Sequence, residues 1–219
     1  MNIHTLSMGM TNCYIIQDKG TIMVDSGPPN SLDRFKKSVQ KASIDPKEIK
    51  LIVNTHGHYD HIGSTKVIKD ATGAQIAMHQ PDKEWLEKSI SPVVPGVNNW
   101  GKILTKIPSH PQISATLVDI NLGNEDFSLL PFGIPGKVVY TPGHTMGSVS
   151  VLLETGDAFI GDLAMSGFPL RLNPGLPIFA EDITKVKESI RMLLEKGAKT
   201  FYPGHGKPFP ANSIKSNHN

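Results

Sequence analysis

Apolar positions along the chain follow two different spacings. Short, mostly apolar runs predict buried strands at residues 13–17, 21–25, 49–55 and 74–79. Between them, Ser31 to about Ala42 and Asp60 to about Ala71 carry apolar residues three or four positions apart, the spacing of a helix with one buried face. Ser31 is a suitable N-cap for the first helix. Strands and helices therefore alternate through the first third of the chain.

The rest of the chain shows the same spacings, with irregular stretches between them. Strands are predicted at residues 115–120, 127–132, 137–141, 148–154, 157–163 and 199–203. Residues 181–196 predict an amphipathic helix, whereas 91–102 and 164–180 have the composition of loops. This order predicts an α/β (α+β) fold in which two layers of sheet have helices outside. The 219 residues fit one domain, 1–219, with an irregular insertion around 80–135.

Charge and cysteine content narrow the function classes. The 22 Lys and Arg residues nearly balance 20 Asp and Glu residues, and no run of like charges predicts a nucleic-acid partner. The single cysteine, Cys13, excludes an internal disulfide and lies in an apolar run. Neither a secretory leader nor an apolar span of bilayer length is visible, so we expect a cytoplasmic protein without a membrane partner.

Candidate chemistry is concentrated in the segment HGHYDH, which directly follows the predicted strand at 49–55. It places His56, His58, Asp60 and His61 within six positions. Alternation past the end of a strand puts His56 and His58 on one side. Imidazole and carboxylate groups are common ligands of transition metals. A chance cluster of polar loop residues is the alternative, and four ligand types so close together favour a metal site.

Three more ligand types follow predicted strands further along. They are His144 in PGHTMGS, Asp162 in FIGDLA and His205 in YPGHGKP. A buried imidazole or carboxylate without a partner is costly, so polar groups at apolar strand ends require a reason. A shared metal site supplies one reason for all seven residues.

The set HGHYDH, PGHTMGS, GD and PGHG resembles the motifs of the metallo-β-lactamase fold superfamily. The opening segments NCYII and TIMVDSG also look like the N-terminal strands of that superfamily. The resemblance covers nearly the whole chain and is weakest at 80–135. It implies a four-layered αββα sandwich of the metallo-β-lactamase type.

The resemblance further implies two divalent metal ions, with zinc expected first and iron or manganese as alternatives. His56, His58 and His144 would hold the first ion. Asp60, His61 and His205 would hold the second, and Asp162 would bridge them. A metal-bridging hydroxide would then attack the substrate, with Asp60 as the catalytic residue that steers its proton.

The implied activity is a metal-dependent hydrolase of the glyoxalase II-like branch, acting on a small ester, thioester or lactone as a monomer or homodimer. The principal alternative is a persulfide dioxygenase-like oxidoreductase with a single iron, which would use the first-site ligands alone. Phosphodiesterase and β-lactamase activities rank lower. The leading prediction therefore has a small-molecule substrate as its only partner.

A few other residues are candidates for supporting roles. Asp25, in VDSG, could support a ligand or cap a turn. Trp100 and Phe168 lie in predicted loops and could contact substrate or pack locally. Arg171 could bind an anionic substrate group, or remain solvated.

Overall fold

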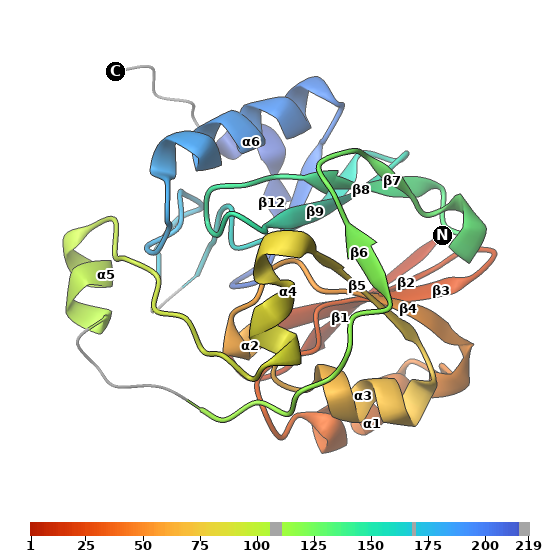
Figure 1. Cartoon of the computed structure of the whole chain (residues 1–219). Coiled ribbons are helices and arrows are strands. Elements are labelled where there is room, and N and C mark those ends of the chain that lie inside the picture. Colours follow the sequence, from red (N-terminus) through yellow and green to blue (C-terminus); the bar gives the residue numbers. More distant parts are fainter. Residues whose placement is uncertain (106–110, 168–169, 215–219) are drawn as a thin grey trace.

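The computed structural model describes residues 1–105, 111–167 and 170–214. Two six-stranded sheets form the centre of the molecule (Figure 1). The first sheet has the order β1 (Asn2–Ser7), β2 (Asn12–Gln17), β3 (Thr21–Val24), β4 (Ile49–Val53), β5 (Gln75–His79) and β6 (Ile120–Leu122). The second has the order β12 (Phe209–Pro210), β11 (Thr200–Pro203), β10 (Asp157–Gly161), β9 (Val149–Leu153), β8 (Gly136–Tyr140) and β7 (Phe127–Ser128).

Helices cover the outer face of each sheet. Figure 1 shows α6 (Ile183–Glu195) over the second sheet, and α1 (Leu32–Lys41) with α3 (Thr65–Thr72) beneath the first. The remaining α-helices are α2 (Tyr59–Ile62), α4 (Gln80–Glu87) and α5 (Asn99–Leu104). Short 3-10 turns lie at Pro46–Glu48, Leu130–Phe132 and Ala211–Ser213. The predicted four-layered αββα fold is confirmed.

Alternation along the strands creates three separate apolar layers. In β2, Cys13 and Ile15 pack toward the helices under the first sheet, while Tyr14 and Ile16 pack between the sheets. In β9, Val151 lies between the sheets and Leu152 packs beneath α6. Each central strand therefore buries both faces, which explains why these strands read as continuous apolar runs.

The predicted helix from Asp60 to Ala71 is wrong in one respect, because it is divided into α2 and α3 at Gly63. The carbonyl of His61 accepts hydrogen bonds from the backbone N–H and the hydroxyl of Ser26, each at 2.8 Å. A helix would need that carbonyl for Thr65. A Cβ at Gly63 would lie 2.3 Å from Pro29, so the break is closely packed.

The segment around 80–135 differs from the prediction in both directions, because it gains a helix and has shorter strands than expected. Helix α5 begins inside the predicted loop 91–102 and extends past it, and the side chain of Asn98 caps it by accepting from the N–H of Gly101 at 2.7 Å. The strand predicted at 115–120 is wrong, since β6 begins only at Ile120. The strand predicted at 127–132 ends at Ser128. Ser31 does occupy the N-cap of α1, but its hydroxyl donates to the Pro28 carbonyl and caps no helical N–H.

Candidate metal centre

All seven candidate ligands lie just beyond the carboxyl ends of strands. His56, His58, Asp60 and His61 follow β4, His144 follows β8, Asp162 follows β10 and His205 follows β11. Strands β8, β10 and β11 run in the same direction, because β9 is antiparallel to both β8 and β10, and β10 is parallel to β11. Their carboxyl ends therefore meet at one edge of the second sheet. This edge faces the loop that follows β4, and the structure brings the two sets of ligands together.

The first ligand group consists of three imidazoles. Nδ1 of His58 lies 3.0 Å from Nε2 of His56 and 2.9 Å from Nε2 of His144. The two Nε2 atoms are 3.2 Å apart. Three ring nitrogens this close can be satisfied together by one cation that accepts all three lone pairs.

The second group consists of Asp60, His61 and His205. Oδ2 of Asp60 lies 3.2 Å from Nε2 of His205 and 3.8 Å from Nε2 of His61. Within this group, one nitrogen or oxygen from each residue lies within 4.8 Å of the others. The mixed nitrogen and oxygen donors are suitable for a second divalent ion.

Asp162 lies between the two groups. Its Oδ1 is 3.4 Å from Nε2 of His61, and its Oδ2 is 3.4 Å from Nε2 of His205 and 3.8 Å from Nε2 of His144. The carboxylate therefore reaches members of both groups at once. This position matches the bridging role that the sequence resemblance implies.

The outer nitrogen of each of three rings is held by an oxygen that can only accept. The Nδ1–H of His205 donates to the Met10 carbonyl at 2.9 Å, and that of His144 donates to the Phe179 carbonyl at 2.8 Å. Nδ1 of His61 lies 2.8 Å from Oδ2 of Asp25. Such contacts fix the tautomer, so that Nε2 of each ring presents a lone pair to the centre.

A hydroxyl group fixes His56 in the same tautomer, with the lone pair on Nε2. The Thr55 hydroxyl donates to the Asp25 carboxylate at 2.9 Å, and so its oxygen accepts from Nδ1 of His56 at 3.1 Å. Asp25 therefore supports one ligand from each group. Its φ of 59° is unusual for a residue other than glycine, which is consistent with a backbone held for the position of this carboxylate.

Two atoms that face the centre have no hydrogen-bond partner among the described residues. They are Nε2 of His61 and Oδ1 of Asp162; both are buried, and they lie 3.4 Å apart without hydrogen-bond geometry. Unsatisfied buried polar atoms are rare and call for a specific explanation, such as an ion. The donor set and these two atoms fit a pair of divalent metal ions.

Charge differs sharply between the two groups. Burial and the neighbouring imidazoles lower the pKa of His56, and burial with His144 lowers that of His58 to about 3. Burial would also lower the pKa of His61, but the carboxylates of Asp60, Asp162 and Asp25 outweigh it and raise the pKa to about 10. Without metal, the first group is neutral and the second holds protons that a metal ion would displace.

Asp82, at the start of α4, connects the two loops of the first group. One oxygen accepts from the N–H of Gly57 at 2.8 Å and from the hydroxyl of Thr145 at 2.7 Å. The other accepts from the N–H of Gly147 at 3.0 Å. Gly57 lies between two ligands, and Thr145 follows His144. Sequence inspection missed Asp82, because a lone acid at a helix start carries no sign of these long-range contacts.

The other candidates have mixed outcomes. Trp100 lies on α5 and is 45% exposed. Arg171 is partly buried, and its Nε has no hydrogen-bond partner among the described residues. Phe168 lies outside the described residues. Cys13 is buried in β2, as expected. No helix in the described part of the chain has the length and apolar character needed to cross a bilayer.

The sequence pattern of the metallo-β-lactamase superfamily matches residues 6–205. The chain belongs to this superfamily. The probable metallo-hydrolase YflN of Bacillus subtilis is 24% identical over 233 residues, covering 98% of this chain and 87% of that protein. A probable metallo-hydrolase of Methanocaldococcus jannaschii, MJ0888, is 26% identical and covers 90% of this chain and 87% of its own length.

Solved structures of the superfamily share the fold. The crystal structure of the B3 metallo-β-lactamase BLEG-1 has a TM-score of 0.72 and 23% identity to this chain, and the alignment covers 100% of this chain and 98% of that one. At this level of identity, the likeness shows a shared fold and does not indicate a shared substrate. The family resemblance predicted from HGHYDH and its partner motifs is confirmed.

Proposed function

We propose that this superfamily member is a dinuclear metal-dependent hydrolase that cleaves a small ester, thioester or lactone. The observation that carries the proposal is Asp162, whose carboxylate lies within 3.8 Å of ligand nitrogens from both groups. A carboxylate between two three-residue groups suits a pair of ions that act on one substrate. The names of YflN and MJ0888, both probable metallo-hydrolases, support the same class of reaction.

Zinc is the proposed metal. The ligands offer imidazole nitrogens and carboxylate oxygens without thiolate, a set that suits Zn²⁺ and also accommodates iron or manganese. Two such ions would polarise a carbonyl oxygen and lower the pKa of a bound water to about 7.

The chain itself orients the reacting groups, and Asp60 is the proposed catalytic residue. Its side chain is 24% exposed, whereas that of Asp162 is 6% exposed, so Asp60 is the carboxylate of the centre that is more open to solvent. The Thr11 hydroxyl donates to Oδ2 of Asp60 at 3.1 Å and fixes its orientation. We assign Asp60 the role of accepting the proton of the attacking water.

The second ligand group argues against the alternative with a single iron. A persulfide dioxygenase-like centre would need only His56, His58 and His144. It would not explain why Asp60, His61 and His205 form a second group of candidate ligands. We therefore retain the hydrolase, with a glyoxalase II-like thioester among its candidate substrates. Cytoplasmic location, a small-molecule partner and a monomer or homodimer complete the proposal.

Elemental analysis of protein purified without added metal tests the proposal. We expect about two divalent ions per chain, and hydrolysis of at least one compound in a panel of short esters, thioesters and lactones. His58→Ala and Asp60→Ala should abolish turnover while circular dichroism shows a retained fold. One iron per chain with oxygen uptake on persulfides would overturn the proposal, as would full activity in either variant.

A further inference from the structure

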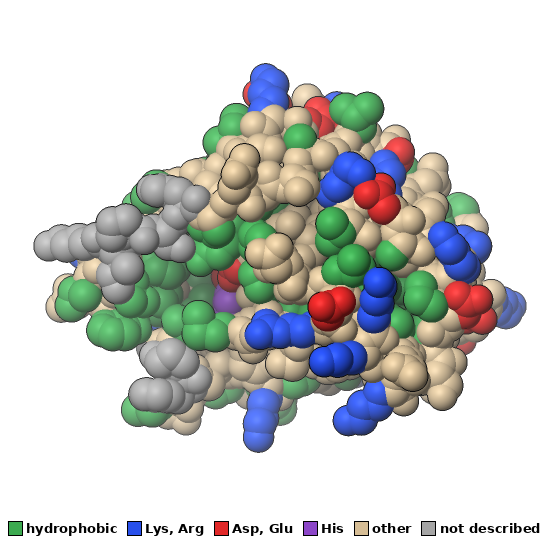
Figure 2. All heavy atoms as spheres, turned by 90° about the horizontal axis from the view of Figure 1, so that it is seen from below, with side chains coloured by type: hydrophobic (Ala, Val, Ile, Leu, Met, Phe, Trp, Pro, Cys, Tyr) green, Lys and Arg blue, Asp and Glu red, His purple; other side chains and the backbone are tan. Residues whose placement is uncertain are grey.

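Apolar side chains border the metal centre on more than one side. Figure 2 shows hydrophobic side chains around a hollow that has a histidine and an acidic side chain on its floor. Met10 is 70% exposed and lines a cavity of about 330 Å³ together with Leu170 and His205. The Met10 carbonyl is also the group that holds Nδ1 of His205. An exposed apolar side chain is thus fixed directly beside a ligand of the second group.

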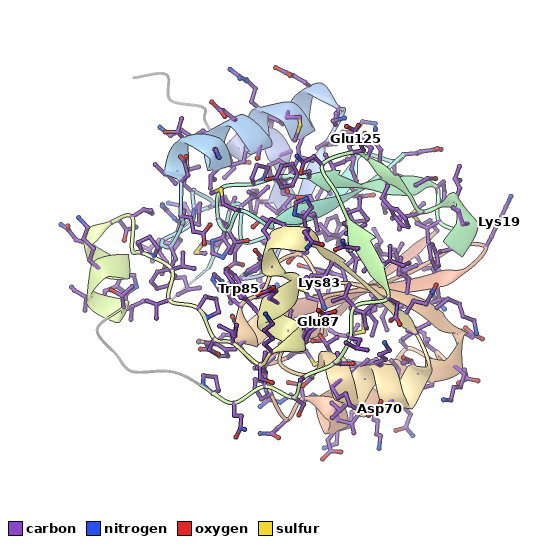
Figure 3. The ribbon with its side chains drawn as sticks, viewed as in Figure 1. Lys19, Asp70, Lys83, Trp85, Glu87 and Glu125 are labelled. Carbon is purple, nitrogen blue, oxygen red and sulfur yellow. The ribbon has the colours of Figure 1, made fainter. Side chains whose placement is uncertain are left out.

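Trp85 occupies a second side. Its ring is parallel to that of His58, with an interplanar angle of 8° and centroids 6.3 Å apart. A Cβ at Gly57 would lie 2.3 Å from the indole, so the ring packs tightly on the loop that carries the ligands. Figure 3 shows Trp85 on a different side of α4 from Lys83 and Glu87. The partly exposed indole therefore belongs to the centre and not to the charged surface of α4.

The segment 93–104 supplies a third side. Gly96 pairs with Phe179, whose carbonyl holds His144, and Val97 donates its N–H to the Ile178 carbonyl at 3.0 Å. This pairing fixes the segment beside the first ligand group. Three of its large apolar residues remain open to solvent: Val93 is 68% exposed, Ile103 is 55% exposed and Trp100 is 45% exposed. We call Met10, Trp85, Val93 and Trp100 the apolar rim.

The cavity beside His205 contains few charged groups. Among the described residues that line it, Met10 and Leu170 are apolar, Asn12 and Ser166 are polar and uncharged, and three are glycines. Lys207 is the charged side chain beside His205, and no carboxylate among the described residues lines the cavity. Binding sites for small molecules are concave, largely apolar and furnished with a few polar groups. Exposed apolar side chains grouped at one place on a surface mark a binding site more often than isolated ones do.

We propose that the apolar rim binds a hydrocarbon chain of the substrate, so that the protein prefers esters or thioesters of medium-length acyl groups. This inference rests on the proposed hydrolase function. The scissile carbonyl would lie at the metal centre, and the acyl chain would extend over Met10 and toward Val93. A second protein chain is a weaker candidate for this surface, because each side of the rim contacts a candidate metal ligand. Met10 contacts His205, Trp85 stacks on His58, and the segment 93–104 reaches His144 through Phe179.

Chain-length dependence of hydrolysis gives the first test. The metal-loaded protein is assayed with p-nitrophenyl acetate, butyrate, hexanoate and octanoate. Full burial of a methylene contributes about 0.8 kcal/mol, which corresponds to roughly a fourfold gain, so we expect kcat/KM to rise about two- to fourfold per methylene. A flat profile, or a preference for acetate, would overturn the inference.

Matched variants locate the effect. Met10→Ser and Val93→Ser should flatten the chain-length profile, so that the ratio of kcat/KM for octanoate to kcat/KM for acetate falls several-fold in each variant. Leu117→Ser and Leu130→Ser are controls, because these side chains are 72% and 62% exposed but belong to segments away from the ligands. An equal loss in control and rim variants would contradict the assignment.

Binding measured without turnover separates this inference from the proposed function. The chain has two tryptophans, and both belong to the apolar rim. Their fluorescence should therefore shift on titration with 1-octanol at concentrations where 1-butanol has no effect, and Met10→Ser should weaken the response. Octanol binding without hydrolysis of any ester, thioester or lactone in the panel would refute the hydrolase but support the rim. Ester hydrolysis with no octanol response would do the reverse. Dimerisation that Met10→Ser abolishes would also overturn the acyl-chain assignment.

Discussion

Oδ2 of Asp25 lies 2.8 Å from Nδ1 of His61, and both side chains are buried. The same carboxylate accepts the N–H of Thr55 at 2.7 Å and the hydroxyl of Thr55, which in turn orients His56. One acid therefore aligns a ligand of each proposed ion. Carboxylates placed behind ligating histidines raise the basicity of the ring as well as fixing its direction.

Asp25→Asn should therefore weaken metal binding about 10- to 100-fold. Asparagine tolerates the left-handed backbone at this position, so the loss would report on the carboxylate and not on backbone strain. Competition with a chromophoric chelator measures the affinity. The exposed Asp70→Asn is the control and should bind metal as the wild type does.

His144→Ala and His205→Ala should each remove one ion selectively. Each side chain belongs to a different three-residue group, and Asp162 is the residue that reaches both. Elemental analysis should therefore give about one ion per chain for each variant, and cobalt substitution should give different visible spectra for the two. Loss of both ions in both variants would instead indicate a single cooperative site.

Gly204→Ala should disrupt the centre by steric clash alone. The φ of Gly204 lies outside the left-handed region, but a Cβ there would lie 2.4 Å from Cε1 of His61 and 2.6 Å from Oδ1 of Asp162. We expect a strong loss of bound metal with a folded chain. Gly123→Ala is the matched control, because nothing lies within 4 Å of its Cβ position. Equal metal content in the two variants would contradict this explanation.

Asp82 should make stability depend on pH in a characteristic direction. Burial raises its pKa to about 6, although hydrogen bonds from Thr145, Gly57 and Gly147 act to lower it. Since this value exceeds the 3.8 of an unfolded carboxyl group, the folded chain retains a proton that the unfolded chain releases. The contribution is fully present below about pH 4 and is lost as pH rises through 6.

Urea unfolding of the metal-free protein tests this direction. Asp82→Asn does not titrate, so the stability of the wild type relative to this variant should fall between pH 4 and pH 7. The expected change is on the order of 2–3 kcal/mol. A difference that is constant over this range, or that grows, would show that the three hydrogen bonds dominate and that the carboxylate is ionised throughout.

The apolar pattern was sufficient to predict the central strands and the two long helices. Strands such as β4 and β9 bury both faces, and α6 buries Val186, Ile190 and Leu193 on one side, so their spacing is unambiguous. It failed where polar contacts decide the structure. Asn98 starts α5 within a segment that reads as loop, and Ser26 ends α2 by binding the His61 carbonyl.

The candidate ligands could be found from the sequence because they follow strands and cluster by type. Their supporting residues could not. Asp82 acts on Gly147, 65 positions away, and the role of Asp25 stayed open because its distance from His61 depends on the fold. Met10 and Trp85 carry no polar signal at all. Their position beside the ligands is a property of the assembled loops.

The two halves of the chain divide the ligands between them. The first sheet and its helices supply His56, His58, Asp60 and His61, and the second supplies His144, Asp162 and His205. Neither half contains a complete centre, so divalent ions would bind side chains from both halves and hold the two sheets together. If the chain is cut at the Gly123–Asn124 bond, in the connection from β6 to β7, the two fragments should therefore bind each other more tightly in the presence of divalent ions than in the presence of a chelator.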